Sequence, residues 1–351
     1  MTNNLSPTSS PLRLVIVGAG EHASNVVHPA LQYNDRITVV GCCDRDAERV
    51  ASASKRFNAP AFTELSDMLS TVEADAALVI AYPWVQADLT IACLEHGLHV
   101  YTEKPLATDW TQVEKVRAAA QAAQRQVAVG FMMRFNPVFQ KMNEAINSPE
   151  FGTPSLFHAR FIAGYRPQTS DLLRVGSIHI FDLAQWLFGP CQEVFASQYE
   201  KDEGQVSISV NATFAKGTVA SLVLSSLGLW TSKGQLYAEV IGDRNVFSVD
   251  NARTWTWQKP PLETIREGIT QTMKEVPAPA EYWEPNYMNV SRFEANSFYL
   301  NGYYQCIDAF VDGVLSGTDQ TNAPTLADGV SALQIALAIE ESVKLGKPVT
   351  V

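Results

Sequence analysis

The sequence predicts two domains: an α/β domain built on a doubly wound parallel sheet, then an α+β domain with an open, mostly antiparallel sheet. The chain of 351 residues is long enough for two hydrophobic cores. Continuous apolar runs alternate with helical patterns up to about Gly130, whereas apolar and polar residues alternate in later segments. We therefore expect domains at 12–130 and 131–351, after a disordered lead-in at 1–11 that is rich in Ser, Thr, Asn and Pro.

Short apolar runs of strand length predict the first domain. Between them, apolar residues recur at helical spacing, for example at Val50, Ala53 and Phe57, and again at Leu89 and Cys93. Runs without alternation are typical of parallel strands that helices cover on both faces, and such strand–helix repeats form doubly wound sheets. The runs occupy residues 12–18, 37–44, 75–81, 98–103 and 126–130.

Alternation of apolar and polar residues predicts the second domain. The segment from Val206 to Asn211 alternates Val or Ile with Ser or Asn, which is typical of a strand with one face toward water. FAKGTVA reads as a hairpin that turns at Lys216-Gly217. Helical patterns are expected at 135–146, 177–188 and 327–345.

Composition excludes several classes of partner. The formal net charge is −11, from 26 basic and 37 acidic side chains, which argues against nucleic acid because basic contacts to phosphates dominate such binding. No apolar run reaches the roughly 18 residues of a membrane-spanning helix, so no membrane is expected. Five scattered cysteines without a CxxC pair favour a reducing compartment, and we expect a cytoplasmic protein. The histidines show no zinc-ligand spacing, so no metal site is predicted.

The segment VGAGEHA places Gly18, Gly20 and Ala23 in a GxGxxA pattern where the first predicted strand meets a helix. Such glycines let the backbone turn sharply and approach a pyrophosphate, whose charge the amides of the following helix meet. A plain tight turn has the same pattern, but the position in the first strand–helix unit favours a dinucleotide-binding Rossmann domain. We include Glu21 and His22, which open the helix, in the expected cofactor site.

Asp44 ends the second predicted strand, about where an acidic residue hydrogen-bonds the adenosine ribose. A carboxylate there would repel a 2′-phosphate and points to NAD. Arg45 leaves NADP as the alternative cofactor, because a guanidinium can pair with that phosphate. DRDAER also reads as a helix start, so Asp44 as a helix N-cap is the competing interpretation.

The chain resembles the Gfo/Idh/MocA family, the relatives of glucose-fructose oxidoreductase and inositol dehydrogenase, from about residue 12 to 351. The resemblance lies in ordered segments: VGAGEHA, CDRD, AYP, HGLHVYTEKPLATD, GFMMRFNP, GSIHIFDLAQWLFG and DGVSALQIALAIEESVKLGKPV. It implies a nicotinamide-dependent oxidoreductase that acts on a sugar, cyclitol or similar polyol, with the substrate between the nucleotide domain and the open sheet.

The resemblance assigns Lys104 of EKP to the nicotinamide and to the reacting hydroxyl or carbonyl. Glu103 would line the nicotinamide pocket, and Pro105 is expected to follow a cis bond. Independently of the family, Lys104 ends a predicted strand, and ligands of doubly wound sheets bind beyond the carboxyl ends of the strands. An ammonium there would stabilise alkoxide character on the substrate oxygen. A solvated lysine at a strand end is the alternative.

The resemblance also implies that His179 faces the substrate and acts as acid or base, or orients it. A lone histidine on an apolar helical face otherwise packs in the core. Inositol dehydrogenase relatives carry an aspartate four residues before this histidine, where the chain has Val175, and Asp171 is a full turn further away. Asp182 matches the family pattern; substrate contact and a hydrogen bond within the fold are both expected roles for it.

Other positions extend the expected site. Tyr82 and Pro83 follow the third long run and would contact the cofactor, while relatives often have a histidine after AYP where this chain offers Gln86. Arg134 is expected to contact substrate or cofactor phosphate, or to form a structural salt bridge. The aromatic residues between 281 and 304 suit a sugar pocket, a core or a subunit contact, and we assign Tyr282, Trp283 and Tyr287 no role.

Together these residues predict hydride transfer between NAD(H) and a sugar, cyclitol or related polyol or keto-sugar, with Lys104 polarising the reacting oxygen and His179 relaying the proton. The alternatives are a non-catalytic, nucleotide-responsive regulatory protein of the same fold and a sugar-nucleotide oxidoreductase with tightly bound cofactor. An open sheet with one free face usually needs a cover, so we expect a homo-oligomer, a dimer or tetramer, packed through the C-terminal sheet.

Overall fold

The computed structural model describes residues 10–202, 204–229, 235–243, 245–259, 280–284, 297–318 and 322–351. It divides into two compact units: Met1–Met132 with Ser297–Val330, and Met133–Asn296 with Ser331–Val351. The division at Met132 lies close to the expected boundary at residue 130, and the later segment Ser297–Val330 also packs into the first unit. Most of the expected lead-in and Tyr287 lie outside the described residues.

The first unit contains a six-stranded parallel sheet in the order β3-β2-β1-β4-β5-β6. The strand order reverses beside β1, which confirms the predicted doubly wound sheet and places the ligand crevice of such sheets at the carboxyl ends of β1 and β4. Each predicted run forms a strand, and the short β3 is an addition. The bounds are β1 Leu12–Val17, β2 Ile37–Cys43, β3 Ala61–Phe62, β4 Ala76–Val79, β5 His99–Thr102 and β6 Val127–Val129.

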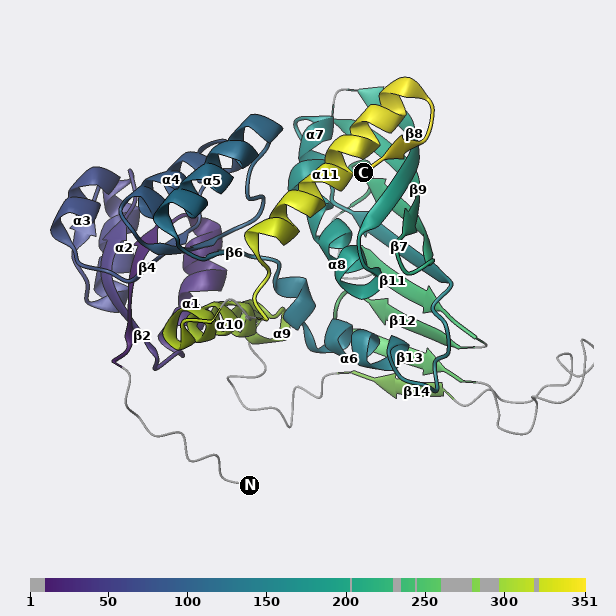
Figure 1. Ribbon diagram of the computed structural model, residues 1–351, viewed down its shortest axis with the longest axis horizontal. Helices are drawn as coiled ribbons and strands as arrows, with labels where there is room; N and C mark the ends of the chain where they lie inside the picture. Colours follow the sequence, from purple (N-terminus) through teal and green to yellow (C-terminus); the bar gives the residue numbers. More distant parts are fainter. Residues whose placement is uncertain are drawn as a thin grey trace, which may run out of the picture. The chain divides into compact units, whose positions relative to one another are not determined.

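Helices cover both faces of this sheet, with α4 and α5 on one side and α1 and α10 on the other (Figure 1). Local chemistry fixes their ends: Asp46 caps α2 by accepting the amide hydrogens of Glu48 and Arg49, and Asp109 caps α5. The bounds are α2 Ala47–Phe57, α3 Leu65–Thr71, α4 Pro83–Glu95, α5 Trp110–Ala123, α9 Ser297–Leu300 and α10 Tyr303–Ser316. The π-helical turn η1 Ala23–Val27 runs directly into α1 His28–Gln32.

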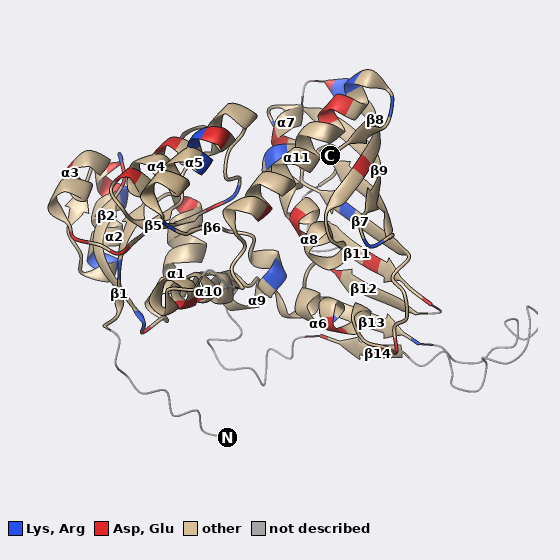
Figure 2. Cartoon of the chain, viewed as in Figure 1, with Lys and Arg blue, Asp and Glu red and all other residues tan. Residues whose placement is uncertain are grey.

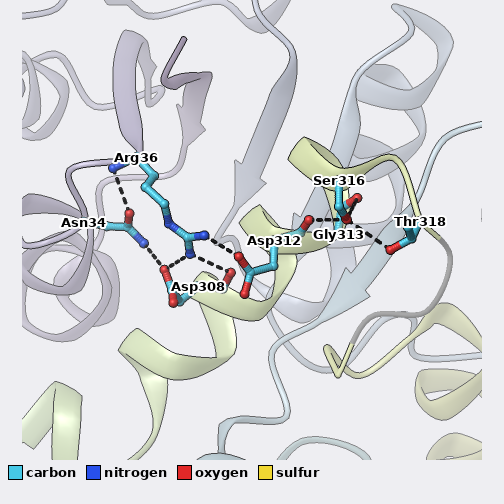
Figure 3. A network of polar contacts seen from close by, with 7 residues as sticks. All are labelled: Asn34, Arg36, Asp308, Asp312, Gly313, Ser316 and Thr318. Atoms are coloured by element: carbon cyan, nitrogen blue, oxygen red, sulfur yellow. Dashed lines mark hydrogen bonds and ion pairs between the residues drawn. The ribbon is translucent and has the colours of Figure 1, made fainter. Parts of the chain in front are cut away.

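A polar network joins α10 to the residues just before β2, within the first unit (Figure 3). Asn34 Nδ2 donates to Asp308 Oδ1 at 2.7 Å, and the Arg36 guanidinium pairs with the carboxylates of Asp308 and Asp312. On the buried side, the Tyr101 hydroxyl of β5 donates to Cys306 Sγ at 3.6 Å. The segment after residue 296 therefore supplies part of the first unit's core.

The second unit contains a nine-stranded sheet in the order β14-β13-β12-β11-β7-β10-β9-β8-β15. Among the described strands of this second sheet, only the pair β7 and β10 is parallel, so the predicted open, mostly antiparallel sheet is confirmed. The bounds are β7 Leu156–Ile162, β8 Cys191–Asp202, β9 Gln205–Phe214, β10 Val219–Ser225, β11 Leu236–Ile241, β12 Val246–Asp250, β13 Thr254–Gln258, β14 Ala280–Trp283 and β15 Val349–Thr350.

Alternate residues of β9 face the core, as predicted. Val206, Ile208 and Val210 are buried, while Ser209 and Asn211 are exposed. The expected hairpin joins β9 to β10, with Gly217 at φ 89°, the left-handed region that favours glycine. This unit also contains helices α6 Pro137–Ile146, α7 Thr169–Asp171 and α8 Ile178–Phe188 and the π-helical turn η3 Leu172–Gly176. The 3₁₀ turn η2 Met132–Phe135 and helix α11 Leu326–Leu345 run from the first unit into the second.

Acidic and basic side chains are interspersed over the helices and strands of both units (Figure 2). Across the described ranges, none of the helices combines the length and the apolar character needed to cross a membrane. All five cysteines are buried and unpaired by disulfides.

Candidate functional site

The glycine turn after β1 has the tight geometry that its sequence predicts. Gly18 has φ +103°, its amide donates to Cys43 O at 2.8 Å, and a Cβ there would lie 1.9 Å from Ile80 O. A side chain at this position is therefore excluded by both conformation and space. Gly20 has no atom within 4 Å of the place where its Cβ would be, so the backbone there is open to a ligand.

Asp44 is hydrogen-bonded to the backbone of the glycine turn. Its Oδ2 accepts the Ala19 amide hydrogen at 2.6 Å, and its Oδ1 accepts that of Asp46 at 2.9 Å. The cap of α2 is Asp46, so the N-cap interpretation of Asp44 is wrong. The half-buried Asp44 carboxylate instead lies at the carboxyl end of β2 beside the glycine turn, while Arg45 is exposed. The turn and the neighbouring carboxylate fit the pyrophosphate and ribose of a dinucleotide.

Gln86 joins the loops that follow β4 and β5. It is fully buried in the first turn of α4, where Pro83 is the first residue; its Oε1 accepts the Ala81 amide hydrogen at 2.8 Å and its Nε2 donates to Glu103 O. The sequence showed Gln86 only as a departure from the family. Its position in the sequence could have indicated burial, because Gln86 lies one helical turn before Thr90, on the buried side of α4. A buried side-chain amide needs hydrogen-bond partners.

Tyr82 and Trp84 flank this buried amide on the outside. Both side chains are exposed, and their rings stack with centroids 4.8 Å apart and an interplanar angle of 5°. Tyr82 and Pro83 follow β4 at the start of α4, and their contact with the cofactor stays a prediction. The stacked rings of Tyr82 and Trp84 give this edge an apolar, flat surface.

Glu103 directly follows β5 and is a buried carboxylate with 3% of its surface exposed. Its Oε2 accepts the Lys104 amide hydrogen at 3.2 Å, whereas its Oε1 has no hydrogen-bond partner among the described residues and lies 3.9 Å from His22 Nε2. Gly130 makes room for it, because a Cβ there would lie 2.9 Å from Oε1. The Lys104-Pro105 bond is cis, as the resemblance implied, and Lys104 is half-buried.

Two phenols lie near the Glu103 carboxylate. Burial raises the pKa of Tyr303 and of Tyr101 well above the ordinary range, and the nearby Glu103 carboxylate raises both further. Both side chains are therefore neutral at any physiological pH. Tyr303 was not singled out from the sequence, because its position in α10 shows no sign of a return to the first unit.

In the second unit, His179 is the second residue of α8 and is buried. The chain before it does not continue as a regular α-helix: Val175 lies in the π-helical turn η3, closed by the Ser177 amide donating to Leu172 O at 2.7 Å. Arg174 fixes this turn to α11 by donating from Nε to Glu340 Oε1 at 2.8 Å. Where inositol dehydrogenase relatives carry an aspartate four residues before the histidine, this chain thus has the apolar Val175, in a π-helical turn that is wider than an α-helical turn.

Arg134 and Asp182 form a buried two-point ion pair. Arg134 Nε lies 2.9 Å from Asp182 Oδ2 and Nη2 lies 2.5 Å from Oδ1, with 9% and 1% of the two residues exposed. This is the structural salt bridge that was one of the expected roles of Arg134. Lys104 belongs to the first unit and His179, Arg134 and Asp182 to the second. The described residues contain no group of three His, Cys, Asp or Glu side chains arranged to hold a metal.

Comparison with known proteins agrees with this architecture. A model of an oxidoreductase family with an NAD-binding Rossmann fold matches residues 12–131, and the model of the same family's C-terminal α/β domain matches residues 144–351. Inositol 2-dehydrogenase 3 of Saccharopolyspora erythraea is 24% identical over 356 residues, which cover 97% of this chain and 95% of that protein.

Solved structures of low sequence identity share the fold. A dehydrogenase from Chromobacterium violaceum aligns with a TM-score of 0.83 at 19% identity over 97% of each chain. The WlbA dehydrogenase from Bordetella pertussis, in complex with NADH and UDP-GlcNAcA, aligns with a TM-score of 0.78 at 20% identity over 98% of this chain and 99% of that chain. With its glycine turn, its strand order and both family domains in place, the chain belongs to the Gfo/Idh/MocA family of oxidoreductases with an NAD-binding Rossmann domain.

Proposed function

We propose that this oxidoreductase transfers a hydride between NAD(H) and a secondary alcohol of a sugar, cyclitol or related polyol, or the corresponding keto-sugar, in the cytoplasm. The observation that carries the proposal is the position of Lys104, which follows β5 on the carboxyl edge of the parallel sheet beside a backbone that Gln86 holds in place. The relative named inositol 2-dehydrogenase supports the substrate class.

Bound NAD supplies the hydride acceptor, and the chain supplies charge and proton handling. Lys104 would place an ammonium beside the substrate oxygen, where it stabilises the alkoxide character that develops as the C–H bond breaks. His179 would take the hydroxyl proton during oxidation and return it during reduction. The side chain of Val175 is apolar and cannot supply a carboxylate, so we propose that His179 acts without the carboxylate that inositol dehydrogenase relatives place four residues earlier.

The test is a substrate screen followed by one substitution. Purified protein is mixed with myo-inositol, other polyols, keto-sugars and UDP-N-acetylated sugar acids, each with NAD or NADH, and nicotinamide absorbance is followed. Lys104→Met should lower kcat by about 100- to 1000-fold while NADH binding, followed by fluorescence, changes little. Turnover within a few-fold of wild type in a folded, NADH-binding variant would refute the role of Lys104.

A sugar nucleotide is the second candidate substrate. The WlbA dehydrogenase of similar fold is seen with NADH and UDP-GlcNAcA, and in that version the cofactor would stay bound while the substrate is oxidised. Protein that carries nicotinamide through purification, and that turns over only the UDP-sugar of the screen, would favour this candidate over a free polyol.

We further propose that the protein is a homo-oligomer, a dimer or tetramer, packed through the sheet of the second unit. One face of β8 leaves Phe195 and Tyr199 exposed, and the same alternation exposes Ser209 and Asn211 on β9. Aromatic side chains on a sheet face gain from cover by a second copy. Light scattering at micromolar concentration should give at least twice the 38.5 kDa of the chain; a monomer would contradict the proposal.

A further inference from the structure

Arg166, in the loop after β7, carries a positive charge for which the described part of the second unit supplies no partner. The residue is half-buried, and its Nε is enclosed by protein with no hydrogen-bond partner among the described residues. No ion pair within the described ranges includes its guanidinium. Enclosing a charged group is costly unless an opposite charge or hydrogen bonds compensate it. Hydride transfer, as proposed above, gives this charge no role.

The backbone around Arg166 is fixed at one edge of the second sheet. Gly164, two residues earlier, turns the chain with φ 68°. Gly204, in the turn between β8 and β9, approaches so closely that a Cβ there would lie 2.1 Å from Arg166 O. Ser226, just beyond β10, donates from Oγ to Gly204 O at 2.5 Å. The segments at the ends of β7, β8 and β10 therefore hold Arg166 in place.

A second unpaired donor lies at the same end of β7. Gln235 is next to the last residue of that strand, because its carbonyl accepts the Ile162 amide hydrogen at 2.8 Å. It is 8% exposed, and its Nε2 has no hydrogen-bond partner among the described residues. The N–H groups of a guanidinium and of an amide can only donate, so both need an acceptor. One charged and one neutral donor at the same strand end fit a carboxylate or a phosphate.

The acidic residues of the adjoining segments do not provide that acceptor. Asp171 in α7 and Asp202 at the end of β8 are described in full, and neither is hydrogen-bonded or ion-paired with Arg166. The chain has 37 acidic side chains against 26 basic ones, so carboxylates are available in excess. An arginine left unpaired in such a chain is better matched to a ligand than to the protein.

The loop of Arg166 is a neighbour of the turn that leads to His179. A Cβ on Gly176 would lie 3.7 Å from the Cβ of Ala163, so η3 packs against the residue that directly follows β7. His179 comes three residues after Gly176, in the first turn of α8. Arg166 and His179 therefore belong to the same region of the second unit.

We propose that the carboxyl end of β7 binds an anionic group of the substrate, a carboxylate or a phosphate, with Arg166 as the charged donor and Gln235 as the neutral one. The substrate is then a sugar acid, a sugar phosphate or a sugar nucleotide rather than a neutral polyol. That the ligand is a sugar rests on the proposed function, whereas the preference for an anion rests on Arg166 and is measured by binding alone.

Calorimetry of the NADH-loaded full chain tests this preference with matched ligands. D-glucuronate and D-glucose 6-phosphate are each compared with D-glucose, and UDP-N-acetylglucosamine is compared with N-acetylglucosamine. Wild type should bind the anionic member of at least one pair about 10- to 100-fold more tightly than the neutral member. The pair that shows the preference tells whether the anion is a carboxylate, a phosphate or the diphosphate of a nucleotide.

Three variants assign the preference to this strand end. Arg166→Gln should reduce it to within about threefold while the Kd values for the neutral sugar and NADH stay unchanged. Gln235→Leu should reduce it by less, because a neutral donor forms a weaker hydrogen bond with an anion. Arg160→Gln, at an exposed position of β7, should behave as wild type. Thermal melts identify a variant that does not fold; Arg166→Gln is expected to fold, because it breaks no hydrogen bond or ion pair of the described residues.

The outcomes separate this inference from the proposed function. Wild-type protein without a preference in any pair, or an unchanged preference in Arg166→Gln, would overturn the anion site even if neutral polyols are turned over. A preference that depends on Arg166 in a protein that oxidises none of these sugars would support the anion site and count against the proposed function.

Discussion

The guanidinium of Arg134 and the carboxylate of Asp182 meet at 2.9 Å and 2.5 Å in a buried, two-point ion pair. Arg134→Met should lower the free energy of unfolding by about 3–5 kcal/mol, because it leaves a buried carboxylate without its charge partner. Urea denaturation measures the change. The matched control is Arg117→Met, which removes an exposed pair with Glu114 and should cost less than about 1 kcal/mol. Equal effects of the two substitutions would contradict the assigned role of the buried pair.

The two glycines of the first turn should respond differently to the same substitution. Gly18→Ala forces a side chain into φ +103° and against Ile80 O, so it should lower stability by at least about 1–3 kcal/mol. Gly20→Ala meets open space and should leave stability nearly unchanged while weakening NADH binding, because the methyl group occupies the approach to the backbone. Thermal melts and NADH fluorescence separate the two effects; a destabilised Gly20→Ala would argue against this geometry.

Gln86 should matter for both stability and cofactor binding. Gln86→Leu removes the side-chain hydrogen bonds to Ala81 and Glu103 and leaves buried backbone groups unpaired, at a cost of about 1–3 kcal/mol. The loosened strand ends should also raise the Kd for NADH by several-fold. Gln121→Leu, on the exposed face of α5, is the control and should change neither quantity. A Gln86→Leu protein with wild-type stability would show that these contacts contribute nothing.

His28 should make stability depend on pH. Burial lowers its pKa from 6.5 to about 4, so the unfolded chain binds a proton at higher pH than the folded chain does. Stability from this group is fully present above about pH 6.5 and is lost as the pH falls toward 4. Between about pH 7 and pH 5 the loss should be about 2 kcal/mol. His28→Leu should lack this part of the slope in urea titrations, whereas exposed His96→Leu should retain it.

The fold followed from local signals in the sequence. The glycine turn, the continuous runs and the alternation from Val206 onward are each set by backbone conformation and by which faces are covered, so neighbouring residues suffice to predict them. The cis bond before Pro105 was implied by the family resemblance and is present.

Other parts of the site depend on contacts that the sequence does not display. Arg134 and Asp182 are 48 residues apart, and nothing in either segment marks them as partners. The Gln86 amide finds its acceptor 17 residues away, at the end of another strand. The π-helical turn at Val175 depends on where Leu172 and Ser177 pack, and helix propensity does not report that. The sequence therefore predicts which residues belong to the site, but it does not predict which of them hydrogen-bond or form ion pairs with one another.

The network that attaches Asp308 and Asp312 to Arg36 has a consequence for synthesis on the ribosome. The nucleotide half of the molecule begins near residue 12, yet part of its core arrives only with Ser297–Val330. Until that segment emerges from the ribosome, Tyr101 lacks Cys306 and Phe310 as neighbours. The nascent Rossmann unit therefore has one face of its sheet incompletely covered. Expression of residues 10–132 alone should therefore give an unstable, aggregation-prone fragment, and adding residues 297–330 through a linker should restore a protected core in hydrogen exchange.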